Sequence, residues 1–276
     1  MNAVYCVGNY EEVFVGDNSN RGMNQINNGT GMLYATPFGE LESGDDTRDI
    51  DGIAASSFLD DIREKRSLNC GVVVPDRFVG ELRESDKLVG MSVDYCRTIA
   101  AALFYGDTNL VKLSSFSEKD NNSFYALQNT TIDVLFGRRV EKKYDFVSSM
   151  SLGGFHFSLP YYIGNGTSSD DVSFFSVTTR EDDATFSSFV NCVSLATIYA
   201  QEKGVQKMNS EEMPSVLIFG RDFRWALRDA VGYSGSYGQI YKKYFKNVAA
   251  EDRGRNRLNN KGGPQFLSWS FSMIFH

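Results

Sequence analysis

The chain has 276 residues, of which 42% are hydrophobic and 23% charged, as in a globular protein with a sizeable core. The net charge of −7 argues against general nucleic-acid binding, and no apolar run approaches the roughly 18 residues of a membrane-spanning helix. Residues 1–66 hold twelve acids against five bases, whereas residues 221–261 hold ten bases against four acids. The basic stretch is either solvated surface or the mark of a partner site.

The first half of the chain predicts an arm followed by alternating helices and strands. Residues 1–55 are rich in Asn, Gly, Asp and Ser without a sustained period, which predicts a loosely ordered acidic arm. Apolar residues at helical spacing then alternate with strand-like runs. Helices are predicted over 57–67, 93–103 and 121–131, strands over 68–74, 109–117 and 132–137, and a loop over 75–87. This order predicts a parallel sheet with right-handed crossovers.

The second half is predicted to be a strand hairpin followed by helices. Alternating aromatic residues predict a strand that includes 155–157 and 161–162, a polar turn over 164–171, and a returning strand over 172–177. Helices are predicted over 183–204, 221–232 and 237–245. The first of these ends at Gly204, which is a typical C-terminal cap.

Cysteine and histidine usage excludes several kinds of site. Cys6, Cys70, Cys96 and Cys192 show no CxxC pair and no metal-ligand spacing. The chain has two histidines, and no paired carboxylates, Ser-His or Cys-His constellation is visible. We therefore predict that the protein is not an enzyme and that it has no metal site and no cofactor.

Four glycosylation sequons exceed the roughly one or two expected by chance in an Asn-rich chain, which favours a secretory route. They begin at Asn28, Asn121, Asn129 and Asn165. The residues after Met1 do not resemble a signal peptide, because they lack a basic region and include two acids. We predict an exterior location, either secreted, periplasmic-like or membrane-associated. The alternatives are a start internal to a longer precursor and a protein that stays inside the cell.

Residues 132–146, "IDVLFGRRVEKKYDF", pass from an apolar strand through a glycine into alternating bases and acids. A strand, a glycine and a helix start together form a common ligand position in α/β proteins. The four bases Arg138, Arg139, Lys142 and Lys143 suit an anion site. The competing interpretation is a solvated helix with Glu141 and Asp145 interleaved.

Several segments together resemble family 3 solute-binding proteins, and most closely the amino-acid receptors of bacterial ABC importers. They are "LNCGV", "GMSVDYCRTIAAALFYGDTNLVKL", "FYALQNTTIDVL", "PYYIGNG", "TTREDDATFSSFVNCVSLATIYAQEKGV" and "FRWALRDAVGYSGSYGQIYKKYF". The resemblance covers residues 57–268. It implies an α/β fold of the type-2 periplasmic-binding-protein class, with a parallel-rich sheet flanked by helices.

The same resemblance implies that one of two lobes is missing. Family members close two lobes around a ligand, but here "SLPYYIGN" leads to "VSFFSVTTREDD" across residues 164–171. We predict an arm over 1–55 and one lobe over 56–270, whose parts 56–163 and 172–270 are joined by that turn. Either the second lobe is truly absent, or mis-joined exons have removed it from the sequence.

The resemblance also locates a ligand site that departs from the family pattern. Phe78 matches an aromatic residue packed over the ligand, although it is equally well interpreted as a loop anchor. Gly137, Arg138 and Arg139 follow the strand that presents the ligand loop, while Asp145 stands where a carboxylate-binding Arg is expected. An acid there repels a carboxylate, so binding of an amino acid or other anion should be weakened or altered.

The cysteines of the family imply a Cys70–Cys96 disulfide, and Cys6 and Cys192 are predicted to be free. We predict a non-catalytic solute-binding module. The alternative is a protein-interaction or structural module, in which the former inter-lobe face meets a partner protein or a second copy.

Overall fold

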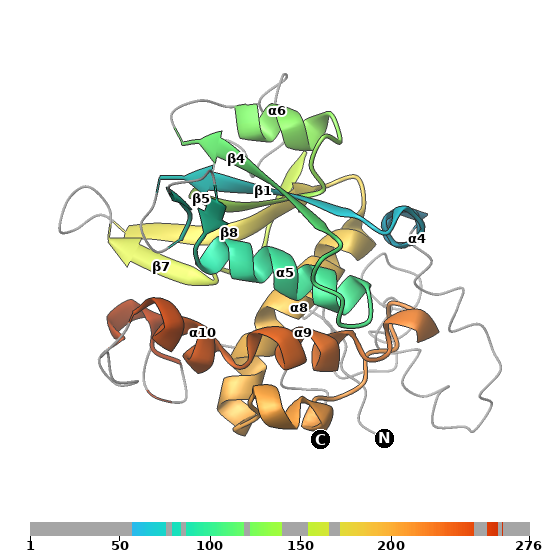
Figure 1. The fold of residues 1–276 in the computed structure, drawn as a ribbon, viewed down its shortest axis with the longest axis vertical. Coiled ribbons are helices and arrows are strands. Elements are labelled where there is room, and N and C mark those ends of the chain that lie inside the picture. The colour runs from blue at the N-terminus through green and yellow to red at the C-terminus, as the bar shows by residue number, and fades with distance from the viewer. Residues whose placement is uncertain are drawn as a thin grey trace, which may run out of the picture.

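A six-stranded mixed sheet runs through the protein (Figure 1). The computed structural model describes residues 57–75, 79–83, 87–118, 122–139, 154–165, 172–245, 253–258 and 261. The strands are β1 (Leu68–Val74), β4 (Val111–Ser117), β5 (Val134–Arg139), β6 (Phe155–Phe157), β7 (Tyr162–Asn165) and β8 (Val172–Arg180). Their order is β4-β1-β5-β8-β6, and β7 also pairs with β8.

The first three strands of the sheet are parallel, as the sequence predicts. β1 pairs in parallel with β4 and with β5. β1 reads LNCGVVV and is buried along most of its length, which is typical of a parallel strand covered on both faces. β8 runs antiparallel to β5, β6 and β7.

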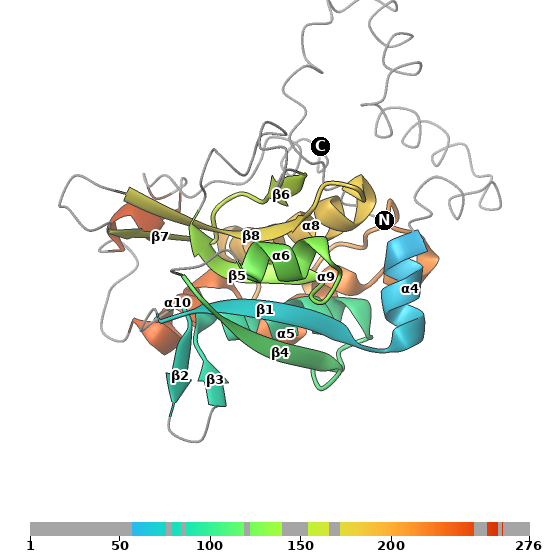
Figure 2. The ribbon, with the colours of Figure 1, turned by 90° about the horizontal axis from the view of Figure 1, so that it is seen from above.

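Helices cover both faces of the sheet unequally (Figure 2). The α-helices are α4 (Ser57–Lys65), α5 (Met91–Leu103), α6 (Asn122–Gln128), α8 (Ala184–Lys203), α9 (Ala226–Ser234) and α10 (Tyr237–Tyr244), and the 3-10 helices are η2 (Lys207–Glu212), η3 (Arg221–Phe223) and η5 (Gly254–Asn256). α5, α8, α9 and α10 contribute to one large apolar core, whereas α6 packs over a smaller core. No helix in the described ranges is long and apolar enough to cross a membrane.

The longest helix has the ends that its sequence predicts. The Asp183 side chain caps α8 by accepting a hydrogen bond of 2.8 Å from the Phe186 N–H. Gly204 ends the helix in the left-handed conformation, with a φ of 75°. Between these caps nearly every side chain from Phe186 to Ala200 is buried, so α8 lies inside the lobe rather than on its surface.

Several local predictions differ from the structure. The single strand predicted to include 155–157 and 161–162 is two strands, β6 and β7, and the helix predicted over 221–232 is divided into η3 and α9. The predicted loop over 75–87 contains an antiparallel pair, β2 (Glu81–Arg83) and β3 (Lys87–Val89). The strand predicted to end at Gly137 continues to Arg139, with an irregular register between Leu135 and Arg138. Arg138 and Arg139 are therefore strand residues, and the predicted helix start after Gly137 is wrong at these two positions. Its remaining residues lie outside the described ranges.

A β-hairpin stands where the chain was predicted to turn back. β7 ends at Asn165, β8 begins at Val172, and the two strands pair antiparallel, with Tyr162 opposite Phe175. Apart from the small β2–β3 pair, the described residues contain no second sheet on which another lobe would be built.

The outer edge of β7 is paired with a side chain. The Ile163 N–H donates to Oδ1 of Asn256 at 2.8 Å, and Nδ2 of Asn256 donates to the Ile163 carbonyl at 2.8 Å. Asn256 belongs to η5 and is 5% exposed. One amide side chain thus satisfies both backbone groups that Ile163 turns away from β8.

Candidate functional site

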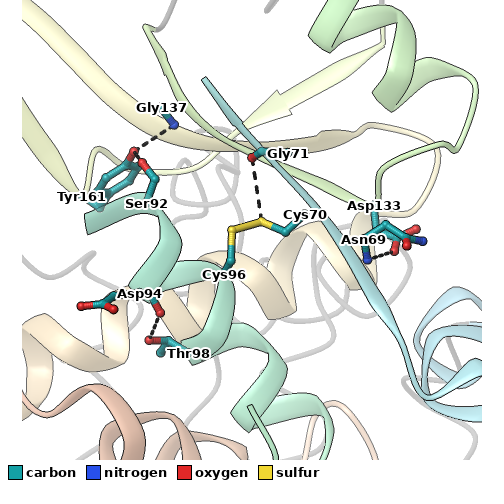
Figure 3. The surroundings of a disulfide bond; sticks show 10 residues. All are labelled: Asn69, Cys70, Gly71, Ser92, Asp94, Cys96, Thr98, Asp133, Gly137 and Tyr161. Atoms are coloured by element: carbon teal, nitrogen blue, oxygen red, sulfur yellow. Dashed lines mark hydrogen bonds between the residues drawn. A yellow bond between two sulfur atoms is a disulfide. The ribbon is translucent and has the colours of Figure 1, made fainter. Parts of the chain in front are cut away.

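The candidate site lies where β1 and β5 end and α5 begins. In parallel α/β sheets, ligands bind at the carboxyl ends of strands and at the N-termini of the helices that follow. Here Gly137 comes from β5, Ser92 from the first turn of α5, and Tyr161 from the residue before β7 (Figure 3). All three residues are buried.

The Tyr161 hydroxyl forms hydrogen bonds with the backbone N–H and the hydroxyl at this position. The Gly137 N–H donates to it at 3.0 Å, and Ser92 Oγ lies 2.9 Å away, where either hydroxyl can donate (Figure 3). Tyr161 is 2% exposed and Ser92 is fully buried. A backbone N–H and a hydroxyl are groups that bind ligand oxygens well, and here they bind an oxygen of the chain itself.

Aromatic rings fill the space around this hydroxyl. The Tyr161 ring centroid lies 4.9 Å from that of Tyr95 and 5.5 Å from that of Phe136. The Tyr95 hydroxyl in turn lies 3.1 Å from Thr197 Oγ1 of α8. Burial is the main cause that raises the pKa of Tyr95 above its ordinary value, so its phenol stays neutral. The site is a packed hydroxyl network within the core.

Gly137 is required at its position by its backbone and its neighbours. Its φ is +79°, a conformation that favours glycine. A Cβ at this position would lie 3.0 Å from the Val73 carbonyl oxygen and 3.3 Å from the Val73 nitrogen. The close approach of β1 therefore fixes both the glycine and the direction of its N–H toward Tyr161.

Arg138 points to the other face of the sheet. Its Nη1 donates to the Glu118 carbonyl at 2.9 Å, and its guanidinium lies 4.9 Å from the centroid of the Phe124 ring in α6. The residue is 4% exposed. Its charge is held by contacts within the lobe, on the side opposite Tyr161.

For the other residues of the predicted ligand set, the prediction stays untested, because their side chains lie outside what the structure describes. Arg139 ends β5, where its Cα is opposite Phe175, and its side chain is not among those described. Phe78 and the charged residues Lys142, Lys143 and Asp145 lie outside the described residues.

A disulfide joins the two elements that frame the site. Cys70 of β1 is bonded to Cys96 of α5, the pair that the resemblance implies, with their Cα atoms 6.0 Å apart (Figure 3). Cys192 is also disulfide-bonded. The prediction that Cys192 is free is therefore wrong. Its partner lies outside the described residues, and Cys6 lies outside them too.

The N-terminus of α5 carries an ion pair that the sequence does not predict. Lys243 of α10 binds Oδ2 of Asp94. The Tyr244 hydroxyl lies 2.7 Å from the same oxygen and 2.9 Å from the Gly90 carbonyl, and its one proton can be donated to either. Burial, followed by the charge of Asp94, raises the pKa of Tyr244 above its ordinary value. The three side chains hold α10 against the start of α5. A contact that spans 149 residues leaves no local signal in the sequence.

Among the four sequons, the structure describes the side chains of all three residues of the one at Asn129. Asn129, Thr130 and Thr131 are all exposed in the turn after α6. Asn165 ends β7, and its side chain is not described; Asn28 and Asn121 lie outside the described residues. Nowhere in the described ranges do three or more His, Cys, Asp or Glu residues form a group that could hold a metal ion.

This lobe has the fold of a type-2 periplasmic binding protein, so the fold predicted from the sequence is confirmed. The chain is similar to the ABC transporter periplasmic binding protein of Brucella ovis with glutathione bound. The TM-score is 0.61 and the identity 20%, over 77% of this chain and 98% of that one.

Two further solved structures match less well. The arginine-bound domain 1 of TmArgBP, from T. maritima, has a TM-score of 0.37 and 22% identity, over 49% of this chain and 95% of that one. The cysteine-binding protein of Campylobacter jejuni has a TM-score of 0.44 and 12% identity, over 71% of this chain and 97% of that one. No protein-family model matches the chain, and a search of curated proteins gives no match.

Proposed function

We propose that this protein is a non-catalytic binding module built from one solute-binding lobe, in which amino-acid binding is weakened or altered because the Tyr161 hydroxyl occupies the polar groups at the carboxyl ends of β1 and β5. The observation that supports this proposal is the buried hydroxyl of Tyr161, bonded to the Gly137 N–H and to Ser92. Small-molecule sites usually enclose 70–90% of their ligand, and this position is enclosed by the chain's own side chain. Tight binding of a free amino acid is therefore not expected.

The first test is a thermal-shift titration of the full chain with the common amino acids and with glutathione. A ligand at 100 times its Kd stabilises a protein by about 2.7 kcal/mol, which raises the melting temperature of a lobe of this size by several degrees. We expect no shift. A rise of several degrees with any of these compounds contradicts the closed site.

A second test asks whether Tyr161 behaves as an internal ligand. The Tyr161→Gly variant removes the whole side chain, and p-cresol, the free side chain of tyrosine, should then raise its melting temperature. Toluene, which has the same shape without the hydroxyl, should raise it less, because it cannot accept from Gly137 or pair with Ser92. The exposed Tyr125→Ala variant should respond to neither compound. Equal rescue by p-cresol and toluene would show that the hydroxyl contacts contribute nothing.

A second candidate function is self-association through the former inter-lobe edge, by which we mean the carboxyl ends of β1 and β5 and the elements beside them. Two large apolar side chains, Phe174 of β8 and Leu82 of β2, remain 44% exposed. β8 pairs with the end of β5, and Gly80, just before β2, lies against the Val73 carbonyl near the end of β1. Exposed apolar side chains of this size favour an interface when they lie on one surface. Light scattering after size exclusion should then show a dimer that Phe174→Ser and Leu82→Ser weaken. A monomer at high protein concentration contradicts this candidate.

A further inference from the structure

The turn between α6 and β5 presents a complete sequon. α6 ends at Gln128, and Asn129, Thr130 and Thr131 follow it as three consecutive exposed residues. Their backbone is fixed, because the N–H groups of Asn129 and Thr131 donate to the carbonyls of Tyr125 and Ala126, each at 2.9 Å. Thr130 has a φ of 58°, which bends the chain away from the helix axis. The turn is thus held at its backbone while its side chains face the solvent.

This turn lies at the opposite end of the lobe from Tyr161. The Asp133 N–H, just before β5, donates to the carbonyl of Asn69 at the start of β1 at 2.8 Å. β5 then runs parallel to β1 toward Gly137, where the Tyr161 hydroxyl lies. A bulky group on Asn129 would therefore leave the carboxyl edge of the sheet open.

The disulfide bonds favour an oxidising compartment, and sequons are glycosylated in such a compartment. Cys70–Cys96 is buried between β1 and α5, and Cys192 is also disulfide-bonded. Disulfides persist mainly in oxidising compartments, such as the secretory pathway, where Asn-X-Thr sequons are modified. The disulfides and the sequon are independent features of the chain, and both fit that route.

We propose that Asn129 is an N-glycosylation site and that its glycan covers the end of the lobe away from the Tyr161 position. In the reaction, Nδ2 of Asn129 forms a bond to the anomeric carbon of an oligosaccharide. The bond from that carbon to a lipid-linked diphosphate breaks, the lipid diphosphate leaves, and the amide nitrogen loses one proton to a base. Thr131 supplies the hydroxyl of the sequon.

The sequon at Asn165 is a natural comparison. Asn165 ends β7 where the hairpin turns, at the same edge of the sheet as Gly137, because β7 runs antiparallel to β8 and β8 antiparallel to β5. The backbone of Asn165 therefore lies at the carboxyl edge of the sheet, whereas Asn129 lies at the opposite end of the lobe. Occupancy of Asn129 thus leaves the carboxyl edge free for a partner.

The experiment uses the full chain, purified from its own cells and, in parallel, secreted from a eukaryotic host. Peptides that contain Asn129 are analysed by mass spectrometry before and after an amidase that removes N-glycans and converts the modified Asn to Asp. We expect this conversion at Asn129. Asn129→Gln and Thr131→Ala should each remove one glycan from the secreted protein, whereas Thr131→Ser, which keeps the hydroxyl, should retain it.

Two results would overturn the proposal. One is recovery of the Asn129 peptide unmodified from disulfide-bonded protein of both sources. The other is a glycan count that Thr131→Ala and Thr131→Ser change equally, since the site would then not depend on the sequon hydroxyl. Because Thr131 is exposed, neither substitution should disturb the core.

Discussion

The two faces of the central sheet are covered in different ways. On one face, α5 from the first half of the chain packs with α8, α9 and α10 from the second half, and the Cys70–Cys96 disulfide joins this layer to the sheet. On the other face, α6 covers a small apolar cluster, beside which Arg138 is buried. The small cluster consists of Val73, Phe124, Leu127, Ile132, Leu135, Phe155 and Phe157.

This difference indicates where the lobe gains its stability. The larger core collects helices that are far apart in sequence, so most long-range apolar burial lies on the α5 side. The Tyr161 hydroxyl network is embedded in that side and is therefore well protected. The α6 side holds a charged group by specific contacts instead, and substitutions there should cost less.

The largest effect is expected in the larger core. Phe189 of α8 is fully buried and contacts the rings of Phe219 and Phe223 edge-on at 5.1 and 5.3 Å. Phe189→Ala should lower the free energy of unfolding by about 3–5 kcal/mol, measured by urea denaturation. The exposed Tyr125→Ala is the matched control and should change it by less than about 0.5 kcal/mol. Similar losses in both variants would remove the distinction between core and surface.

The Cys70–Cys96 disulfide is expected to make the next largest contribution to stability, on the same face of the sheet as the larger core. Cys70 and Cys96 are 26 residues apart, and closing a loop of this length stabilises the folded state by about 3.5 kcal/mol in the chain-entropy model. The double variant Cys70→Ala, Cys96→Ala should lose about that much in chemical denaturation. An unchanged denaturation midpoint would mean that the bond contributes no stability to this layer.

Substitution of Arg138 measures how much this buried charge contributes to stability on the α6 face of the sheet. Arg138→Ala removes a guanidinium–ring contact worth about 2 kcal/mol when desolvated and a charged hydrogen bond to the Glu118 carbonyl. We expect a loss of roughly 2–3 kcal/mol in the free energy of unfolding and no change in any ligand titration. The exposed Arg255→Ala should be close to neutral. A ligand-dependent difference between Arg138→Ala and the parent protein would return Arg138 to the binding site.

The smallest expected effect concerns pH. Burial raises the pKa of the Asp133 carboxyl above its ordinary value, against the opposing hydrogen bond from the Asn69 N–H at 2.7 Å. As pH rises from the ordinary carboxyl pKa through the raised one, the unfolded chain loses this proton first, so stability falls. Asp133→Asn should remove that part of the slope in a plot of unfolding free energy against pH. Parallel curves for the two proteins would contradict this assignment.

Local patterns predicted most of the fold, because the relevant signals are short in range. Strand 68–74, the helix that begins near Asp94 and the Gly204 cap follow from apolar spacing and terminal residues. The parallel pairing of β1 with β4 and β5 follows from the strand–helix order. The β2–β3 hairpin was missed because three-residue strands carry no recognisable period.

The candidate site was only partly predictable. The position of Gly137 after a predicted strand suggested a ligand site. Its N–H instead donates to the hydroxyl of Tyr161, which is 24 residues later and beyond the range of local sequence patterns. A run of bases suggested an anion site, yet Arg138 turns toward Phe124 because the strand continues past Gly137. Near an irregular register, the backbone conformation decides which face of the sheet a side chain points to. The sequence does not reveal this conformation.

The Asn256 side chain covers part of an edge strand that could otherwise pair with another protein chain. An uncovered edge strand offers its N–H and C=O groups as a template to another chain, which leads to edge-to-edge aggregation. At β7 a single amide pairs with Ile163 and occupies that template, as a seventh strand would. A lobe that ends in a hairpin thus remains closed to strand addition at this edge, at the cost of one buried asparagine.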